Sequence, residues 1–326
     1  MLGGTGFLGP FIVKQLVERG DDVTLFHRGQ REPALTSGAR HVHGDFARLP
    51  EHVADLGDPE VVVDVNPGLG KAGHGVLHFT GVAERGVVVT SMDVYRAMSV
   101  LWRVEAAGPA QPMPVTEDAE LRTQPSPDLG SELDFDNVAV EQAVAAHAHD
   151  FPVTVLRCPV IYGPRDPQRR LRQYVRRMAD ARRAIILDAR LARFRVTRGY
   201  VENVAAAVVA AVSDERAAGR TYNVGEAHAL SEAEWVRAIA GEFGWDGDVV
   251  VADPAALPVE LHAPLPEQDL VGDTSRIRDE LGYAESVPRA EGLRRAIAWE
   301  RAQQRDEPPV DYAAEDAALR QLLRNQ

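Results

Sequence analysis

The N-terminal part of the chain alternates between helical and strand patterns of apolar residues. Leu8, Ile12 and Leu16 recur at the spacing of one helix face, and Pro10 stands where the first turn of a helix tolerates proline. Gly20 follows this run, as glycine often does just after a helix. The pattern predicts a loop, then an amphipathic helix, then a short strand at residues 23–26.

Two later runs are rich in β-branched residues without strict alternation. They cover residues 61–65 and 86–90. Continuous runs of this kind are typical of parallel strands, because such strands are covered on both faces. Strands alternating with helices predict an α/β fold built on a doubly wound parallel sheet.

A glycine-rich loop precedes the first predicted helix. Gly3 permits a tight turn, Gly6 lets backbone approach a pyrophosphate, and Gly9 lets the helix pack on the sheet. The free N–H groups at the helix start then face the phosphates, which predicts dinucleotide contacts along the loop. The alternative is a structural loop with no ligand. The predicted cofactor-binding residues here are Gly3, Thr5, Gly6, Phe7, Leu8 and Gly9.

The strand that should precede this loop has only Met1 and Leu2 to form it. In a doubly wound sheet that strand is central. We therefore expect the first strand to be missing or truncated, and the true start of the chain to lie upstream.

The residues that would read the adenosine ribose follow the strand at residues 23–26. A carboxylate there selects NAD through the 2′-hydroxyl, whereas this chain offers Arg28 and Arg31, which can pair with a 2′-phosphate. NADP is therefore the preferred cofactor and NAD the alternative. Exposed arginines in a polar loop are the other explanation.

Composition and charge exclude several classes of protein. The chain of 326 residues is 45% apolar, enough for one large or two smaller domains, and its net charge of −13 argues against a nucleic-acid-binding surface. No apolar segment reaches the roughly 20 residues that span a bilayer, and residues 1–13 lack the basic leader of a signal peptide. The single cysteine, Cys158, cannot form an internal disulfide, so we expect a cytoplasmic protein with a buried, inert thiol.

Several motifs occur in an order that resembles the NAD(P)-dependent epimerase/dehydratase family of extended short-chain dehydrogenases. The resemblance runs from Gly3 to about Trp299. Its motifs are the loop at residues 3–9, His43-Gly44-Asp45, Ser91 with Val94-Tyr95, and residues 157–164, 198–201, 221–225 and 273–277.

The resemblance implies a Rossmann core with a smaller C-terminal substrate lobe. It assigns residues 1–163 to the dinucleotide-binding core, with residues 195–225 returning to it. The substrate lobe then comprises residues 164–194 and 226–305, and residues 306–326 form a linker and a terminal helix. Within the second half, Ser231 and Glu234 form a capping box for a helix ending near Gly244, and Asp273 or Thr274 opens another that stops at Gly282.

The resemblance also implies roles for single residues. Asp45 and Phe46 would flank the adenine, Pro159, Val160 and Ile161 would lie along the nicotinamide, and Arg198 would meet a substrate phosphate. Ser91 would be the catalytic serine. Each has a simpler explanation: Asp45 capping a turn, Ser91 holding its loop, and Arg198 pairing with a carboxylate such as Glu202. Asn66 is a further candidate for cofactor contact, because it follows the strand at residues 61–65 and active groups gather at strand carboxyl ends.

The central Tyr-x-x-x-Lys pair of the family is absent. The lysine position holds Asn137, and the tyrosine position holds Leu133, or Phe135 if the register shifts. Losing a positioned acid/base lowers rates by roughly 10²- to 10⁴-fold. Asp93, close to Ser91, is the candidate replacement. Two functions stay open: an oxidoreductase or epimerase acting on a nucleotide sugar or similar polar metabolite, or a non-catalytic NAD(P)-binding sensor or regulatory protein.

Two other groups of charged residues carry weaker predictions. His41 and His43 share one face of a strand, but no third ligand has metal spacing, so no metal is assigned. Residues 164–183 are dense in arginine, which suits a phosphorylated or acidic small molecule but also a solvated helix face. Beyond residues 306–309, a terminal helix carries an apolar stripe that can dock on its own chain or on a neighbour, so a homodimer is possible. The stripe comprises Ala313, Ala317, Leu319, Leu322 and Leu323.

Overall fold

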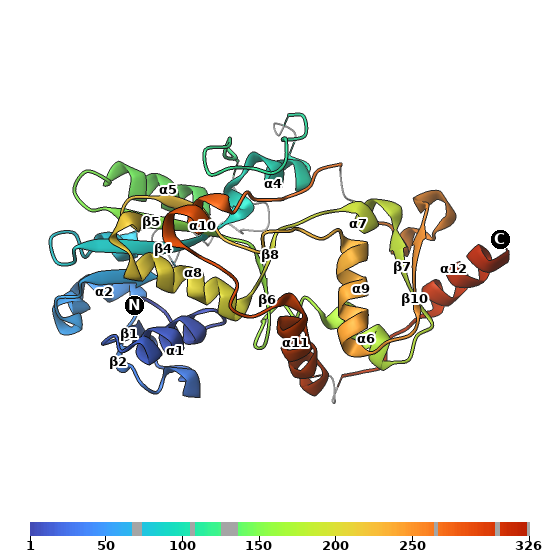
Figure 1. Cartoon of the computed structure of the whole chain (residues 1–326), viewed down its shortest axis with the longest axis horizontal. Coiled ribbons are helices and arrows are strands. Elements are labelled where there is room, and N and C mark those ends of the chain that lie inside the picture. The colour runs from blue at the N-terminus through green and yellow to red at the C-terminus, as the bar shows by residue number, and fades with distance from the viewer. Residues whose placement is uncertain (67–73, 105–107, 125–135, 264–266, 304–306, 325–326) are drawn as a thin grey trace.

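The computed structural model describes residues 1–66, 74–104, 108–124, 136–263, 267–303 and 307–324. Its main sheet is parallel, with strand order β3-β4-β5-β9 and, beside it, the pair β1-β2 (Figure 1). The strands are β1 (Thr24–His27), β2 (Arg40–His43), β3 (Val61–Asp64), β4 (Arg85–Ser91), β5 (Val153–Cys158) and β9 (Thr221–Asn223). The strands predicted near residues 23–26, 61–65 and 86–90 are confirmed.

Leu2 joins the two parts of the sheet. It forms parallel bridges to Phe26 of β1 and to Asp64 of β3, and its N–H donates to the carbonyl of Val63 over 2.7 Å. Gly3 N–H donates to the carbonyl of Phe26 over 3.0 Å. We expected the first strand, between β1 and β3, to be missing or truncated. Leu2 is the residue that forms bridges to both neighbours at this position.

A cavity of about 520 Å³ lies between β1 and β3, on the side of Leu2 away from the glycine-rich loop. Its walls include Met1, Leu16, Phe79 and Val212, together with residues of β1 and β3. The N-terminal ammonium of Met1 is buried, donates to the carbonyl of Thr24 over 2.7 Å, and has its pKa lowered to about 5 by burial. The sheet is therefore underfilled between β1 and β3.

Helices cover both faces of the sheet, as the doubly wound prediction requires. Val63, Val87 and Leu156 pack with α1 (Gly9–Arg19) and α8 (Val201–Ser213) on one face. The residues beside them in each strand, Val62, Val88 and Val155, pack on the opposite face. That face is covered by α2 (Leu49–His52), α3 (His74–Leu77) and α5 (Asn137–Ala146). Both faces are apolar because adjacent strand residues point to opposite sides.

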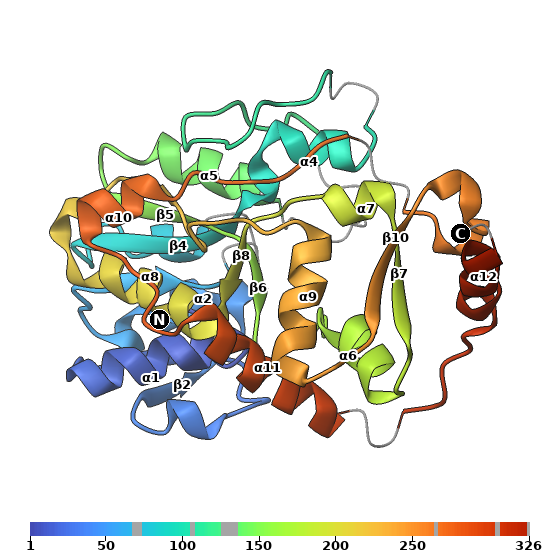
Figure 2. The ribbon, with the colours of Figure 1, turned by 45° about the vertical axis from the view of Figure 1, so that its right-hand side comes forward.

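The second half forms a smaller lobe at the other end of the molecule (Figure 2). Its parallel pair β7-β10 packs beside α7 and α9, and α6 and α11 pack on α9. The pair β6-β8 connects this lobe with the sheet. The elements are β6 (Val160–Tyr162), α6 (Arg172–Ala179), β7 (Ala184–Asp188), α7 (Ala189–Arg193), β8 (Arg198–Tyr200), α9 (Glu232–Phe243), β10 (Asp248–Ala252) and α11 (Arg289–Gln303).

Two predicted helices are confirmed with their caps. Helix α9 begins with the capping box of Ser231 and Glu234 and ends at Gly244, which is left-handed at φ 75°. Helix α10 (Ser275–Leu281) follows Thr274 and ends at Gly282. Although its residues fall in the range assigned to the lobe, α10 packs on β9 and α8 of the core.

The terminal helix α12 (Ala313–Arg324) docks on its own chain. Ala318 and Leu322 pack with Ala252 and Leu257, next to β7 and β10. The predicted stripe is wrong in detail, because Ala313, Ala317 and Leu323 are exposed. The buried face of α12 is turned by about one residue from the predicted stripe. Glu315 also lies on this buried face and pairs with Arg177 of α6. None of the described helices is both long enough and apolar enough to cross a bilayer.

Candidate functional site

A second cavity, of about 400 Å³, lies at the carboxyl ends of β3, β4 and β5, beside the glycine-rich loop. It brings together eight of the residues predicted to form the site: Gly6, Phe7, Leu8, Gly9, Asn66, Ser91, Pro159 and Ile161. Strand carboxyl ends meet here because the strands are parallel. The segments that line the cavity are far apart in the sequence, so the fold itself assembles the site.

The three glycines of the loop differ in what requires them. Gly3 has φ +83°, a left-handed conformation that other residues rarely adopt. A Cβ on Gly9 would stand 2.4 Å from the Cα of Gly4, so the protein backbone itself excludes a side chain. A Cβ on Gly6 would meet no protein atom within 4 Å. Gly6 therefore faces open space in the cavity, and packing within the protein does not explain its lack of a side chain.

The backbone at this loop is also unpaired. Helix α1 has no side-chain cap at Leu8. Among the described residues, none accepts a hydrogen bond from the backbone N–H groups of residues 6–9. A helix start with free N–H groups attracts anions, because the helix dipole adds to the hydrogen-bonding capacity.

Ser91 lies at the end of β4, where the chain turns into a short 3₁₀ segment, Met92–Val94. Its Oγ accepts a hydrogen bond from the N–H of Asp93 over 3.2 Å. Ser91 thus holds its own loop, which was the simpler of its two predicted explanations, and it also lines the cavity.

Asp93 lies directly behind the cavity wall. Its Oδ1 accepts a hydrogen bond from the side-chain amide of Asn137, which lines the cavity, over 2.9 Å. Burial raises the pKa of the Asp93 carboxyl to about 6, although the hydrogen bond from Asn137 opposes this change. The carboxyl group can therefore exchange a proton near neutral pH.

Asn137 is held by the start of α5. Asp136 caps this helix and forms a paired hydrogen bond with Arg122, with both N–O distances 2.8 Å. Arg122 also donates to the backbone carbonyl of Asp93 over 2.8 Å, so the two sides of the Asp93–Asn137 contact are fixed by one guanidinium. Leu133 and Phe135, the candidates for the tyrosine position, lie outside the described residues.

A buried polar network supports the back of the site. Arg157 of β5 pairs with Glu141 of α5 at 2.7 Å and donates to the hydroxyl of Tyr95 over 3.0 Å. Tyr95 donates in turn to Asn223 of β9 over 2.7 Å. These bonds tie α5, which carries Asn137, to the strands of the sheet.

The other predicted site residues lie outside the cavity. Asp45 caps a 3₁₀ turn by accepting from the N–H of Ala47, and Phe46 packs edge-on against Phe26. Arg28 is exposed just after β1. Gly3, Thr5 and Val160 are also not among the residues that line the cavity.

Arg198 is buried away from this cavity. Its guanidinium pairs with Glu232 and stacks over the ring of Trp235 at 4.6 Å, so its carboxylate partner is not the expected Glu202. One nitrogen, Nη1, is buried with no hydrogen-bond partner among the described residues.

Sequence reasoning did not assign the other seven residues that line the cavity, which are Val65, Val89, Thr90, Asn137, Cys158, Pro167 and Arg170. Asn137 carried a signal, since it occupies the family's lysine position. Cys158 is buried as expected, and burial raises the pKa of its thiol to about 12, which keeps it protonated. Arg170 is paired with Asp166 at 2.6 Å.

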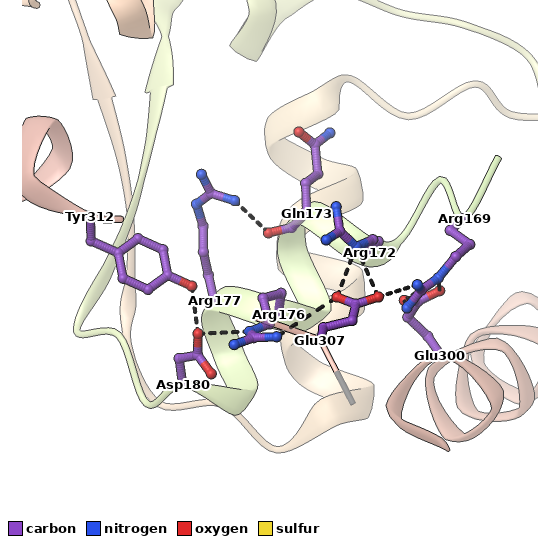
Figure 3. Close-up of polar contacts among 9 residues, drawn as sticks. All are labelled: Arg169, Arg172, Gln173, Arg176, Arg177, Asp180, Glu300, Glu307 and Tyr312. Atoms are coloured by element: carbon purple, nitrogen blue, oxygen red, sulfur yellow. Dashed lines mark hydrogen bonds and ion pairs between the residues drawn. The ribbon is translucent and has the colours of Figure 1, made fainter. Parts of the chain in front are cut away.

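The arginine-rich segment around α6 neither faces water freely nor forms an open basic face. Figure 3 shows Arg169, Arg172 and Arg176 gathered around Glu307, with N–O distances of 3.0 Å from Arg172 and 3.7 Å from Arg176. Arg169 also pairs with Glu300 of α11, and Arg177 and Arg182 pair with Glu315 and Asp316 of α12. Acidic residues of the C-terminal segment thus neutralise five of these arginines.

The sequence profile of the NAD dependent epimerase/dehydratase family matches residues 1–225. The chain belongs to this family. Over 186 residues it is 30% identical to a dTDP-glucose 4,6-dehydratase of Streptomyces griseus. That match covers 56% of this chain and 52% of the dehydratase, so the chain spans about half the length of this relative.

Solved structures of nucleotide-sugar enzymes share the fold. The UDP-glucose 4-epimerase of Thermotoga maritima, determined with UDP-glucose, has a TM-score of 0.69 at 16% identity, covering 93% of this chain and 98% of that one. DesIV, a dTDP-glucose 4,6-dehydratase of Streptomyces venezuelae with NAD and TYD bound, has a TM-score of 0.66 at 19% identity, covering 93% and 96%. The extended short-chain dehydrogenase fold is confirmed.

Proposed function

We propose that this chain binds a nicotinamide dinucleotide in the 400 Å³ cavity at the strand carboxyl ends. The observation that carries the proposal is Gly6, which faces open space beside unpaired N–H groups at the start of α1. A pyrophosphate explains both features, since it needs close backbone approach and accepts hydrogen bonds from free N–H groups. The NAD bound in the related DesIV structure supports the same class of cofactor.

NADP is the proposed form, with NAD as the alternative. Arg28 and Arg31 are exposed after β1, and no described residue forms an ion pair with either of them. Each guanidinium is therefore free to meet a 2′-phosphate, to which arginine binds well.

The proposed reaction is an oxidoreduction or epimerisation of a nucleotide sugar or similar polar metabolite. The cofactor supplies or accepts a hydride when bound. Ser91 would orient the carbonyl oxygen at the cavity wall, and the protonated Asp93 carboxyl would provide the accompanying proton, directly or through a water molecule. The pKa of about 6 for Asp93 and its contact with Asn137 support this role. The nucleotide sugars of the related epimerase and dehydratase support the substrate class.

The cofactor site is tested by comparing Gly6→Ala with Gly241→Ala. Neither added methyl group meets a protein atom within 4 Å, and Gly241 lies in α9, far from the loop. We expect both variants to fold like the wild type. NADPH titration followed by fluorescence should then give at least about tenfold weaker binding for Gly6→Ala only. Equal NADPH affinity in all three proteins contradicts the proposed site.

Catalysis is tested on the same protein with a panel of nucleotide sugars, following the absorbance of the reduced nicotinamide. If Asp93→Asn loses turnover but keeps its affinity for the cofactor, the result supports the proposed catalytic function. The alternative of a non-catalytic sensor is favoured by one observation, the amide of Asn137 at the position where the family has lysine. Tight cofactor binding without turnover of any substrate in the panel supports that alternative.

A further inference from the structure

Four side chains that can bind metal converge at the carboxyl ends of β1 and β2. His27 ends β1, His41 and His43 lie on β2, and Glu32 lies in the connection between the two strands. One ligand atom from each residue lies within 4.8 Å of all the others. The parallel register places His27 beside His43, so the strand pairing supplies the partners that His41 and His43 lack in the sequence pattern.

The distances fit a small ion. His27 Nε2 lies 2.8 Å from His41 Nδ1, His43 Nε2 lies 2.7 Å from Glu32 Oε1, and His41 Nδ1 lies 3.8 Å from the same oxygen. Ligand atoms around a tetrahedral zinc ion stand about 3.3 Å apart, given metal–ligand bonds of about 2.0–2.1 Å. These three separations differ from this value by about half an ångström, and the other pairs lie within 4.8 Å, so side-chain rotation has to bring the ligand atoms closer together on binding.

The orientation of His41 favours coordination through Nδ1. Its other nitrogen, Nε2, lies 3.1 Å from the backbone carbonyl of Thr36, which fixes the ring and places the proton on Nε2. Metal-binding histidines commonly donate their second N–H in this way. His43 is exposed, and its ring lies edge-on to the ring of His27 with the centroids 4.8 Å apart.

His27 has a different part in the cluster. The N–H of Gly29 donates to its Nδ1 over 3.1 Å, which leaves the proton on Nε2, pointing to His41 Nδ1. Without metal, the Nε2–H of His27 donates to the lone pair of His41 Nδ1, and a metal ion needs that lone pair. Coordination by His27 moves its proton from Nε2 to Nδ1 and requires the Gly29 N–H to leave, so His27 should be the weakest ligand.

We propose that Glu32, His41 and His43 bind one divalent transition-metal ion of the zinc class, with His27 as the fourth ligand. Imidazole nitrogens with one carboxylate select zinc, cobalt or nickel over magnesium or calcium, which prefer oxygen ligands. The site uses none of the residues that line the 400 Å³ cavity and does not depend on the proposed function.

The test uses the full chain, purified without a polyhistidine tag and stripped with a chelator. Titration with Zn²⁺ in a calorimeter should give one ion per chain, and Co²⁺ should give the absorption bands of a tetrahedral complex. His41→Ala should weaken Zn²⁺ binding by at least about tenfold, and His27→Ala should weaken it less. His149→Ala is the matched control, because His149 is exposed on another part of the chain.

His43→Gln serves as a second variant if His41→Ala does not fold, and it too should weaken binding by at least about tenfold. Circular dichroism of the stripped proteins verifies folding. The proposal is overturned if the wild type binds Zn²⁺ no better than these variants, if the Co²⁺ bands are absent, or if His149→Ala lowers affinity as much as His41→Ala.

Discussion

At the residue scale, the most informative group is the Asp93 carboxyl. An arginine beside a carboxylate lowers the pKa of that carboxyl group. Asp93 instead has an amide partner, Asn137, while Arg122 binds the backbone carbonyl of Asp93 and the carboxylate of Asp136. Burial therefore dominates, and the pKa of Asp93 rises to about 6. Residues with such shifts gather at functional sites.

The raised pKa makes Asp93 a destabilising group at neutral pH. The folded form binds the proton more tightly than the unfolded chain does, so this contribution to stability is complete below pH 3.8 and is lost as the pH rises through about 6. Asp93→Asn keeps the shape and the acceptor for Asn137 but removes the charge. We expect it to raise the free energy of unfolding at pH 8 by up to roughly 3 kcal/mol, with little difference from wild type near pH 4.

Urea denaturation at a series of pH values measures this effect. Asp58→Asn is the control, because Asp58 is exposed and its replacement should change stability by less than about 0.5 kcal/mol. A variant less stable than wild type at pH 8, or one with an unchanged pH dependence, identifies Asp93 as an ordinary structural anion.

At the element scale, one carboxylate fastens the C-terminal segment to α6. The Glu307 side chain is only 13% exposed and faces Arg169, Arg172 and Arg176 (Figure 3). Three guanidinium groups gathered around one carboxylate repel each other when its charge is removed. Glu307 should therefore contribute more to the attachment of this segment than a carboxylate in an exposed ion pair would.

Glu307→Gln should lower the free energy of unfolding by about 1–2 kcal/mol, between the values for exposed and fully buried pairs. The loss should shrink in high salt, which screens the repulsion. Thermal unfolding at low and high NaCl measures both effects. Glu51→Gln, which breaks an exposed pair with Arg48, should leave the stability nearly unchanged. Equal effects of the two variants contradict the special role of Glu307.

The elements show where sequence reasoning succeeds and where it stops. Helix α9 and its capping box, and the strands near residues 61–65 and 86–90, follow from patterns within a few residues. Pairings across long separations do not, because nothing local to Arg169 indicates that Glu300 and Glu307 will approach it. For the same reason the proposed metal-binding partners of His41 and His43 could not be found before the pairing of β1 with β2 was known.

The candidate site divides in the same way. The glycine loop and the strand ends with Asn66 and Ser91 were predictable from motif and topology, and the structure brings them to one cavity. The contact between Asp93 and Asn137 was not, since it joins the 3₁₀ segment after β4 to the first residue of α5, and their spacing depends on how α5 packs on β4. The roles carried over by resemblance, such as that of Arg198, stay predictions.

At the scale of the whole molecule, the sheet has a cavity at its centre. The cavity of about 520 Å³ lies between β1 and β3, where Leu2 is the one described residue that pairs with both strands. In a chain that begins at Met1, the buried ammonium adds a pH-dependent penalty, because its folded pKa of about 5 lies below the ordinary value of 8.0. Stability is therefore lost as the pH falls from 8.0 towards 5, since the unfolded chain binds this proton and the folded chain does not.

A variant extended before Met1 by four residues, Val-Ile-Val-Val, should fill this cavity as an added stretch of parallel strand. Burying one or two apolar side chains contributes about 1.5–3 kcal/mol each, and the extension also removes the buried ammonium. We expect a higher midpoint of urea denaturation, with a larger gain at pH 6 than at pH 8. The control extension Ser-Gly-Ser-Gly removes the same ammonium without filling the cavity, so it should reproduce only the pH-dependent part. If both extensions stabilise equally at pH 8, the cavity does not accept a strand.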